Sequence, residues 1–400
     1  EESDPTSRGE QYCESWFCAD PSLPGYDPTA SYAQYTETAS FQAGLPDANI
    51  GFGDVVQPWG APAMEAGRVF VNAGYDLDAD TELYAFGSYS ESKTNGNFFY
   101  RYPENGTIEY LREPDGSLYW PLEKFPGGFT PQFFGEVYDI SLAGGMRGTL
   151  ENGLGYDFSA RTGENEIKYE LKNTVNPSMG PDSPTSFIPG DLINSETQFQ
   201  ADFTYEVDTS LASPVLFAFG ASYMDESYEV VEGERASYID GPYATPDPWN
   251  LCTDAGAPTA AGTTAIANGS TLNCADSSDP VFQVVGVGSN GFPGYSPQFS
   301  ELYERSSFAL YGDASADVTD NLFLQGAIRY EDYDDFDSEI VGKLAGKLDI
   351  TDTFGIRASF GTGFRAPTPG QQGKWLPGSN GLVPSWWSCG PGTGCNCSQA

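Results

Sequence analysis

The sequence predicts an all-β protein, and three observations point to that class. Ten segments alternate apolar and polar residues with the period of two that gives a strand two different faces. In residues 198–207, for example, Phe199 and Phe203 share one face, while Gln198 and Asp202 share the other. The connections between the segments are alternately short and long. Aromatic residues make up 14% of the 400 residues although only 39% are hydrophobic, a balance that favours strands.

The length of the segments indicates that they cross a membrane. A strand of about ten residues is long enough to span a bilayer at a tilt. A strand with one apolar face and one polar, water-exposed face is typical of a transmembrane β-barrel, in which the polar face lines the interior. No run approaches the ~18 uninterrupted apolar residues of a membrane helix. A soluble β-sandwich would also alternate, but it predicts no regular difference between short and long connections. We therefore expect a transmembrane antiparallel β-barrel.

The ten expected strands form five pairs, each joined by a short polar turn. The pairs are residues 68–77 with 82–92, residues 137–150 with a strand that begins at Leu154, residues 198–207 with a strand that begins at Val215, residues 306–318 with a strand that begins at Leu322, and residues 343–350 with a strand that begins at Phe354. The turns at 317–322 and 349–354 resemble each other in sequence, which indicates a repeated hairpin.

Long connections follow the second, fourth and sixth expected strands. Outer-membrane barrels have short periplasmic turns and long outer loops, so we expect the long connections to face outside. The first long connection is expected to hold a small hairpin within Thr107–Tyr119. Residues 1–67 are expected to be an extracellular loop region with weakly marked strands, residues 68–372 the barrel, and residues 373–400 a further extracellular loop.

The composition excludes several kinds of chemistry. The net charge of −39 argues against nucleic acid, which needs a Lys/Arg surface. The chain has no His, which removes imidazole acid–base catalysis and most zinc sites. The cluster Cys389, Cys395 and Cys397 matches no zinc spacing, and the acidic run 331–337 is expected to be an exposed strand end rather than a calcium site. We expect no catalytic residue, no cofactor and no metal.

Seven cysteines lie outside the expected strands. Cys252 and Cys274 fall within one long connection, so we expect a loop disulfide between them, formed in an oxidising compartment. The chain begins at Glu1 without Met or signal peptide, which indicates a processed end or an internal cut.

The inward face carries charges of both signs, which we expect to pair within a water-filled lumen. The expected acids are Asp139, Asp157, Asp202, Glu206, Asp313, Glu331 and Asp349, and the expected bases are Arg147, Arg161, Arg329, Lys343, Lys347, Arg357 and Arg365. Loop aromatics could stack on a ligand, but packing among themselves is the expected role of Trp375, Trp386, Trp387 and Tyr243.

Residues 354–372 read FGIRASFGTGFRAPTPGQQ, which resembles a barrel-strand motif of TonB-dependent outer-membrane receptors with an F-R-A-P core. Residues 308–350 resemble the hairpins that precede this motif. Residues 82–90 and 165–190, which include NPSMGPDSPTSF, resemble a proteobacterial branch of the family. The resemblance implies a barrel of about 22 strands with an N-terminal plug inside it. The sequence contains neither a recognisable plug nor a TonB box, so we expect it to be an internal portion of a longer receptor.

The resemblance implies active uptake of a scarce nutrient, energised by the TonB complex through the plug. A ferric siderophore is the default cargo, and a peptide, an oligosaccharide or cobalamin remain alternatives. The expected partners are therefore the TonB energy-transducing complex, a small-molecule nutrient, and the lipid and lipopolysaccharide of the outer membrane. A passive porin-like pore and a structural surface protein are the rival functions.

Overall fold

The computed structural model describes residues 62–372, apart from 102–105, 108, 126–127 and 336, together with two short segments, 11–12 and 55–57. These short segments form an antiparallel pair, β1 (Gln11–Tyr12) and β2 (Val55–Gln57). The rest of the described chain is built around one large antiparallel sheet.

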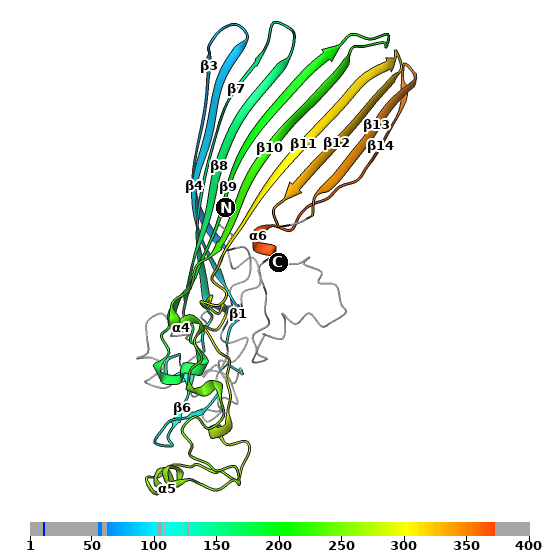
Figure 1. The fold of residues 1–400 in the computed structure, drawn as a ribbon. Coiled ribbons are helices and arrows are strands. Elements are labelled where there is room, and N and C mark those ends of the chain that lie inside the picture. Colours follow the sequence, from blue (N-terminus) through cyan, green and yellow to red (C-terminus); the bar gives the residue numbers. More distant parts are fainter. Residues whose placement is uncertain are drawn as a thin grey trace.

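Ten long strands form this sheet, and each is hydrogen-bonded to the long strands that come before and after it in the chain. They are β3 (Ala63–Asp76), β4 (Thr81–Asn97), β7 (Gln132–Thr149), β8 (Gly155–Lys172), β9 (Ser186–Val207), β10 (Val215–Val230), β11 (Leu302–Thr319), β12 (Leu322–Tyr333), β13 (Glu339–Thr351) and β14 (Phe354–Gly361). The sheet is an open, curved wall with β3 and β14 at its edges (Figure 1). The five predicted strand pairs are confirmed.

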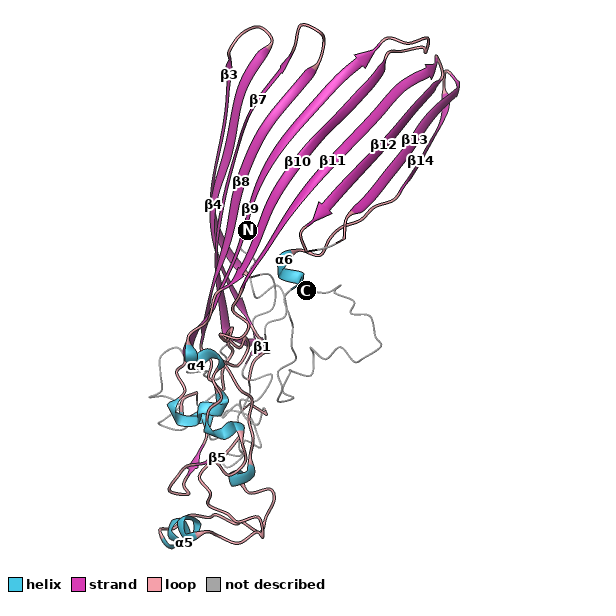
Figure 2. Ribbon diagram, viewed as in Figure 1, coloured by secondary structure: helices cyan, strands magenta, loops and turns pink. Residues whose placement is uncertain are grey.

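The turns within the five pairs lie together at one end of the wall, and the three long connections lie at the other end, together with the short connection between β12 and β13 (Figure 1). Among the residues that the structure describes, helices occur in the long connections and beside the loop end of the sheet (Figure 2). The first long connection contains the predicted small hairpin, formed by β5 (Leu111–Arg112) and β6 (Leu118–Tyr119). No helix in the described part of the chain is long and apolar enough to cross a membrane.

The two repeated turn sequences fold in the same way. β11 and β12 are joined through Asp320 and Asn321, and β13 and β14 through Asp352 and Thr353. In both hairpins the register slips by one residue just before the turn, between Asp317 and Thr319 in one and between Asp349 and Thr351 in the other. Such a bulge increases the local twist and closes the hairpin tightly.

The apolar face of the wall is uncovered, as a membrane barrel requires. Phe199 is 55% exposed and Leu324 is 46% exposed, whereas the β-sandwich alternative would bury both between two sheets. In the described residues, the ten strands belong to one sheet and no second sheet covers this face. The sandwich alternative is therefore wrong.

The apolar band ends in register across neighbouring strands, well before the strands themselves end. Phe199, Tyr223 and Phe308 lie in one row of β9, β10 and β11. The next outward positions toward the loops are polar, with Thr197 on β9 and Asp225 on β10. Aromatic side chains at this level match the interfacial girdle of a membrane barrel.

The strands are longer than the sequence predicts, and the excess lies at the loop end. β9 begins at Ser186 and has 22 residues, although alternation marks only 198–207. Beyond the apolar band the ladder continues, but residues 186–197 carry no regular period-two apolar pattern. On this outer extension Lys93 pairs with Glu136 at 2.8 Å and Lys168 with Glu166 at 3.3 Å.

Candidate functional site

Two regions could contact a solute: the inward face of the wall and the folded long connections at its end. The inward face carries the polar residues of the alternating pattern, held in place by hydrogen bonds between strands. The long connections, residues 98–131, 173–185 and 231–301, pack together, and we call their described residues the loop module.

The inward face of β3, β4, β7 and β8 holds a hollow of about 470 Å³ lined by polar groups. The Tyr84 hydroxyl donates to the Asp157 carboxylate at 2.7 Å, and Arg147 pairs with Glu82 at 2.8 Å. The Arg147 guanidinium also lies over the Tyr84 ring, 5.2 Å from its centre. A tyrosine is thus fixed between an anion and a cation within the wall.

A second polar group occupies the inward face of β9, β11 and β12. Asp202 accepts hydrogen bonds from the Tyr311 hydroxyl and from the Gln200 amide, the latter at 2.7 Å. Gln325 donates to Asp313 at 2.8 Å. These carboxylates are predicted inward residues, and the structure places them among neutral donors.

The predicted pairing of inward charges is confirmed for four of the bases. Arg161 pairs with Glu196, Arg329 with Glu331, and Lys347 with Asp349, in addition to the Arg147–Glu82 pair. Glu82 and Glu196 were not among the predicted acids. Alternation from Gln198 places Glu196 on the inward face, whereas Glu82 shares its face with Tyr84 and Phe86, whose aromatic side chains do not mark that face as inward. The Asp139 carboxylate accepts a hydrogen bond from the Asn165 amide at 3.3 Å.

Two of the remaining predicted bases, Lys343 on β13 and Arg357 on β14, lie near the β14 edge of the sheet. The prediction that Arg365 belongs to the last strand is wrong, because β14 ends at Gly361. Arg357 lies directly opposite Lys347 in the register of β13 and β14. Among the described residues, Lys343, Arg357 and Arg365 form no ion pair within 4.0 Å.

Three apolar clusters give the loop module a core of its own. One contains Leu111, Tyr119, Tyr243 and Val285, with Trp249 against it. The other two gather Leu122, Phe125, Phe129 and Val175, and Leu251, Leu272, Cys274 and Val281. Each of the first two clusters draws residues from different connections, so burial of apolar surface holds the connections together.

Tyr243 is 3% exposed, so its predicted packing role is confirmed. The other predicted loop aromatics, Trp375, Trp386 and Trp387, lie outside the described residues.

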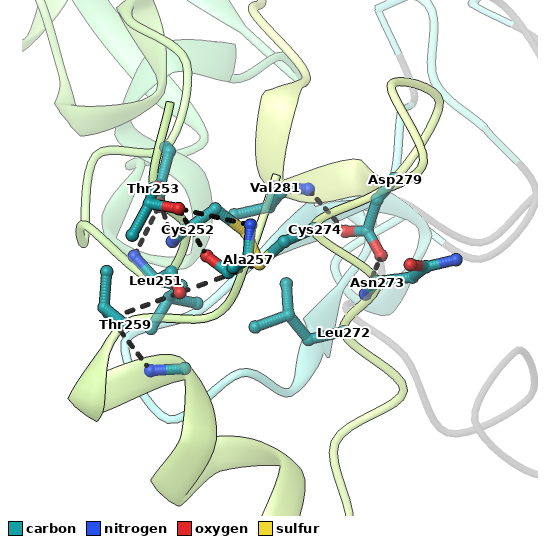
Figure 3. Close-up of a disulfide and its surroundings, with 12 residues drawn as sticks. Leu251, Cys252, Thr253, Ala257, Thr259, Leu272, Asn273, Cys274, Asp279 and Val281 are labelled. Carbon is teal, nitrogen blue, oxygen red and sulfur yellow. Dashed lines mark hydrogen bonds between the residues drawn. A yellow bond between two sulfur atoms is a disulfide. The ribbon is translucent and has the colours of Figure 1, made fainter. Parts of the chain in front are cut away.

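A disulfide closes part of the loop module. Cys252 and Cys274, 22 residues apart, are bonded as predicted, and Figure 3 shows the bridge beside Leu251 and Leu272. Both oxygens of the Asp247 carboxylate accept backbone N–H groups at 2.8 Å, from Leu251 and Cys252. The backbone that carries one half of the bridge is therefore fixed by side-chain hydrogen bonds. The other five cysteines lie outside the described residues.

A buried ion pair ties the first long connection to the third. Arg112 contacts both oxygens of Asp279, at 2.7 and 2.9 Å, and the two side chains are only 3% and 5% exposed. The same carboxylate accepts the N–H groups of Asn273 and Val281, both at 2.9 Å. This bidentate geometry was not predicted, because the two residues are separated by more than 160 positions.

Two opposing effects, burial and favourable polar contacts, set the pKa of Asp279 in this pair. Burial alone would raise the pKa, but the hydrogen bonds from Arg112, Val281 and Asn273, together with the Arg112 charge, outweigh burial. The net effect holds the pKa below its usual value, so the ion pair persists to a lower pH than the usual pKa of Asp would allow.

An aromatic cluster connects the loop module to the inward face of the wall. Phe133 of β7 packs against Tyr169 of β8 and against Phe292 of the third long connection, with ring centres 4.9 Å apart in both pairs. Phe98 lies 5.6 Å from Phe133, and Tyr295 lies 5.8 Å from Phe292. We call these five residues the junction cluster. The wall therefore has short turns at one end. At the other end the junction cluster joins it to the folded loop module.

The comparisons with known proteins agree with this architecture. A family model described as TonB dependent receptor-like, beta-barrel, matches residues 138–393. The chain therefore belongs to the TonB-dependent receptor family, whose barrels lie in the outer membrane. No curated protein matches the chain.

Several solved structures are similar to the chain at low identity. The siderophore receptor PirA from Acinetobacter baumannii is 10% identical, with a TM-score of 0.41, over 76% of this chain and 34% of its own. The ferripyoverdine receptor of Pseudomonas aeruginosa is 15% identical, with a TM-score of 0.38, over 74% of this chain and 35% of its own. The ferric enterobactin receptor PfeA of the same organism, as a mutant bound to enterobactin, is 10% identical, with a TM-score of 0.38, over 83% and 36%. The chain thus spans about a third of the length of these receptors.

Proposed function

We propose that the chain is part of the wall and outer cap of a receptor that imports a scarce nutrient across the outer membrane. The observation that carries this proposal is the division of the sheet into an apolar outward face and a hydrogen-bonded polar inward face, within the segment that matches the family. The apolar face suits hydrocarbon and the polar face suits a solute pathway. Long connections on the cell exterior would place the loop module where a solute arrives.

A ferric siderophore is the proposed cargo, as the family resemblance of residues 354–372 implies. Peptide, oligosaccharide and cobalamin are alternatives that use the same pathway. Energy would come from the TonB complex acting through a plug, as the family resemblance implies. Lipid and lipopolysaccharide of the outer membrane are the proposed surroundings of the apolar band.

The proposal is tested by transport with the full-length gene in its own outer membrane. Cells are grown without iron, and ⁵⁵Fe is supplied as the complex with siderophores from the strain's own culture medium. Deletion of the gene should abolish saturable uptake, and so should deletion of TonB or addition of a protonophore.

Two outcomes would replace the proposal. Uptake that survives loss of TonB and does not saturate would assign a passive pore. Unchanged ⁵⁵Fe uptake in the deletion strain, with loss of growth on cobalamin, peptides or oligosaccharides, would reassign the cargo.

A further inference from the structure

The chain turns back across the inward face of the wall after β14. Thr362 and Gly342 of β13 exchange two hydrogen bonds, at 2.9 Å and 3.1 Å. The Phe364 ring then packs edge-on against Tyr333 of β12, with centres 6.3 Å apart. We call residues 362–372 the strap. It includes the F-R-A-P motif and ends in the short helix α6 (Pro369–Gln372).

The strap reaches back as far as β10. α6 contacts both β10 and β11, and Figure 1 shows it beside the loop end of β11. A Cβ added to Gly370 would come within 2.9 Å of the Tyr228 ring, so the strap backbone lies directly on that side chain. Tyr228, Tyr333 and Arg305 all occupy positions whose side chains point inward in the register of β10, β11 and β12.

Arg305 ties the strap to the wall. Its guanidinium donates to the Glu226 carboxylate on the neighbouring strand, at 3.1 Å from Nε, and also to the Pro367 carbonyl. The Arg305 side chain is 4% exposed and the Glu226 side chain 17%. The same guanidinium lies 5.2 Å from the centre of the Tyr333 ring. One buried cation thus connects two strands, an aromatic ring and the strap backbone.

The part of the wall near the strap is closed to solvent. Ser222 is 8% exposed, Ser307 6% and Ala309 1%, although these are inward positions of a lumen wall. Further from the strap on β11, the inward residues Asp313 and Ser315 are only half-buried.

We propose that the strap is a fixed cover over the inward wall of β10 and β11, and that Arg305 is the residue that positions it. The strap then narrows the passage next to the loop module and withholds Ser222 and Ser307 from any solute in the lumen. This proposal rests on the proposed function only in treating the inward face as a solute pathway. Its test does not depend on transport.

The test uses a cysteine at Ser307 as a reporter in the full-length receptor in intact outer membranes. A membrane-impermeant maleimide is added, and labelling of the peptide that contains position 307 is followed by mass spectrometry. The native strap should keep Ser307→Cys poorly reactive. Arg305→Met removes the tie to Pro367 and Glu226 while keeping an unbranched side chain, and it should raise the labelling rate at least tenfold.

Arg305→Lys should give an intermediate rate, since one ammonium group cannot serve the carboxylate and the carbonyl in the same geometry. Gly370→Leu provides an independent route, because its side chain would collide with Tyr228 and lift the strap without altering Arg305. Ser315→Cys, also inward on β11, is the matched control, and its labelling rate should not change with either substitution.

Heat-modifiable migration of the barrel confirms that each variant is folded. The proposal is overturned if Ser307→Cys already labels as fast as an exposed loop cysteine, or if folded Arg305→Met and Gly370→Leu variants both leave its rate unchanged. The labelling rate alone decides on the strap, and ⁵⁵Fe uptake in the deletion strain alone decides on the proposed function, so the two proposals can fail independently.

Discussion

Breaking the buried Arg112–Asp279 pair should open the loop module locally without unfolding the barrel. Asp279→Ala leaves the Arg112 guanidinium, 3% exposed, without its carboxylate partner. It also removes the acceptor of the Asn273 and Val281 N–H groups. Removal of one partner from a buried ion pair costs about 3–5 kcal/mol, because the remaining charge is left without compensation.

This cost should appear as faster amide exchange in residues 270–285, which surround the pair. At about 1.4 kcal/mol for each factor of ten, the local opening equilibrium should rise by roughly a hundred- to a few thousand-fold. Hydrogen exchange with mass spectrometry on the intact receptor measures this change, and peptides from β8 and β9 serve as internal references that should stay protected.

Lys93→Gln is the matched control, because it breaks an ion pair whose partners are 57% and 39% exposed. An exposed pair contributes only about 0–1 kcal/mol, so exchange should change less than tenfold. An Asp279→Ala variant whose 270–285 peptides exchange within threefold of the parent would refute the assigned energetic role of the pair. Arg112→Met with Asp279→Leu should cost less than the sum of the single changes, since no buried charge remains.

Three further predictions concern the loop module and the wall. Cys252→Ser should raise exchange in residues 247–285 by an amount equivalent to about 3 kcal/mol, the chain-entropy value for a loop closed over 22 residues; unchanged exchange would show that the apolar clusters alone hold the module. The pKa of Asp279 is lowered in the folded state, so the stabilisation that its carboxylate provides is present above the unfolded pKa of about 4 and is lost as pH falls through the folded value. Protection of the amides of residues 270–285 from exchange should therefore fall in that acid range. Asp279→Asn should remove this pH dependence. Phe203→Lys places a charge in the middle of the apolar band and should destabilise the barrel by about 2–4 kcal/mol, whereas Thr204→Lys, between the inward Asp202 and Glu206, should have little effect. Urea titration of heat-modifiable migration measures the stability of both variants. Equal effects would contradict the assignment of the two faces.

The sequence was sufficient for the membrane-spanning part of the fold. In that part, each strand has an apolar side chain facing lipid at every second position. The alternation of apolar and polar residues therefore predicts both the two faces of each strand and its pairing with the next strand. Phe199 on β9 and Tyr223 on β10 illustrate this, because alternation alone places them outward and the ladder pairs them directly.

The loop end could not be predicted to the same depth. Residues 186–197 have no apolar alternation, because they lie outside the apolar band and no face of the strand contacts lipid there. Backbone hydrogen bonds to β8 hold this part of the strand. The Arg112–Asp279 pair and the tie from Arg305 to Pro367 join residues far apart in sequence, and no local pattern marks such contacts. The Cys252–Cys274 bond is the exception, since cysteine chemistry itself restricts the choice of partner.

The extension of the strands beyond Phe199 separates the cap from the bilayer. About a dozen residues of β9 lie on the loop side of the apolar band, at about 3.3 Å per residue along the strand. A change in bilayer thickness is met where hydrophobic side chains meet lipid, by tilting or local deformation. The part of the sheet beyond the apolar band and the junction cluster lie outside that zone. The geometry of the loop module is therefore insulated from hydrophobic mismatch, and this module should keep its structure unchanged in bilayers of different thickness.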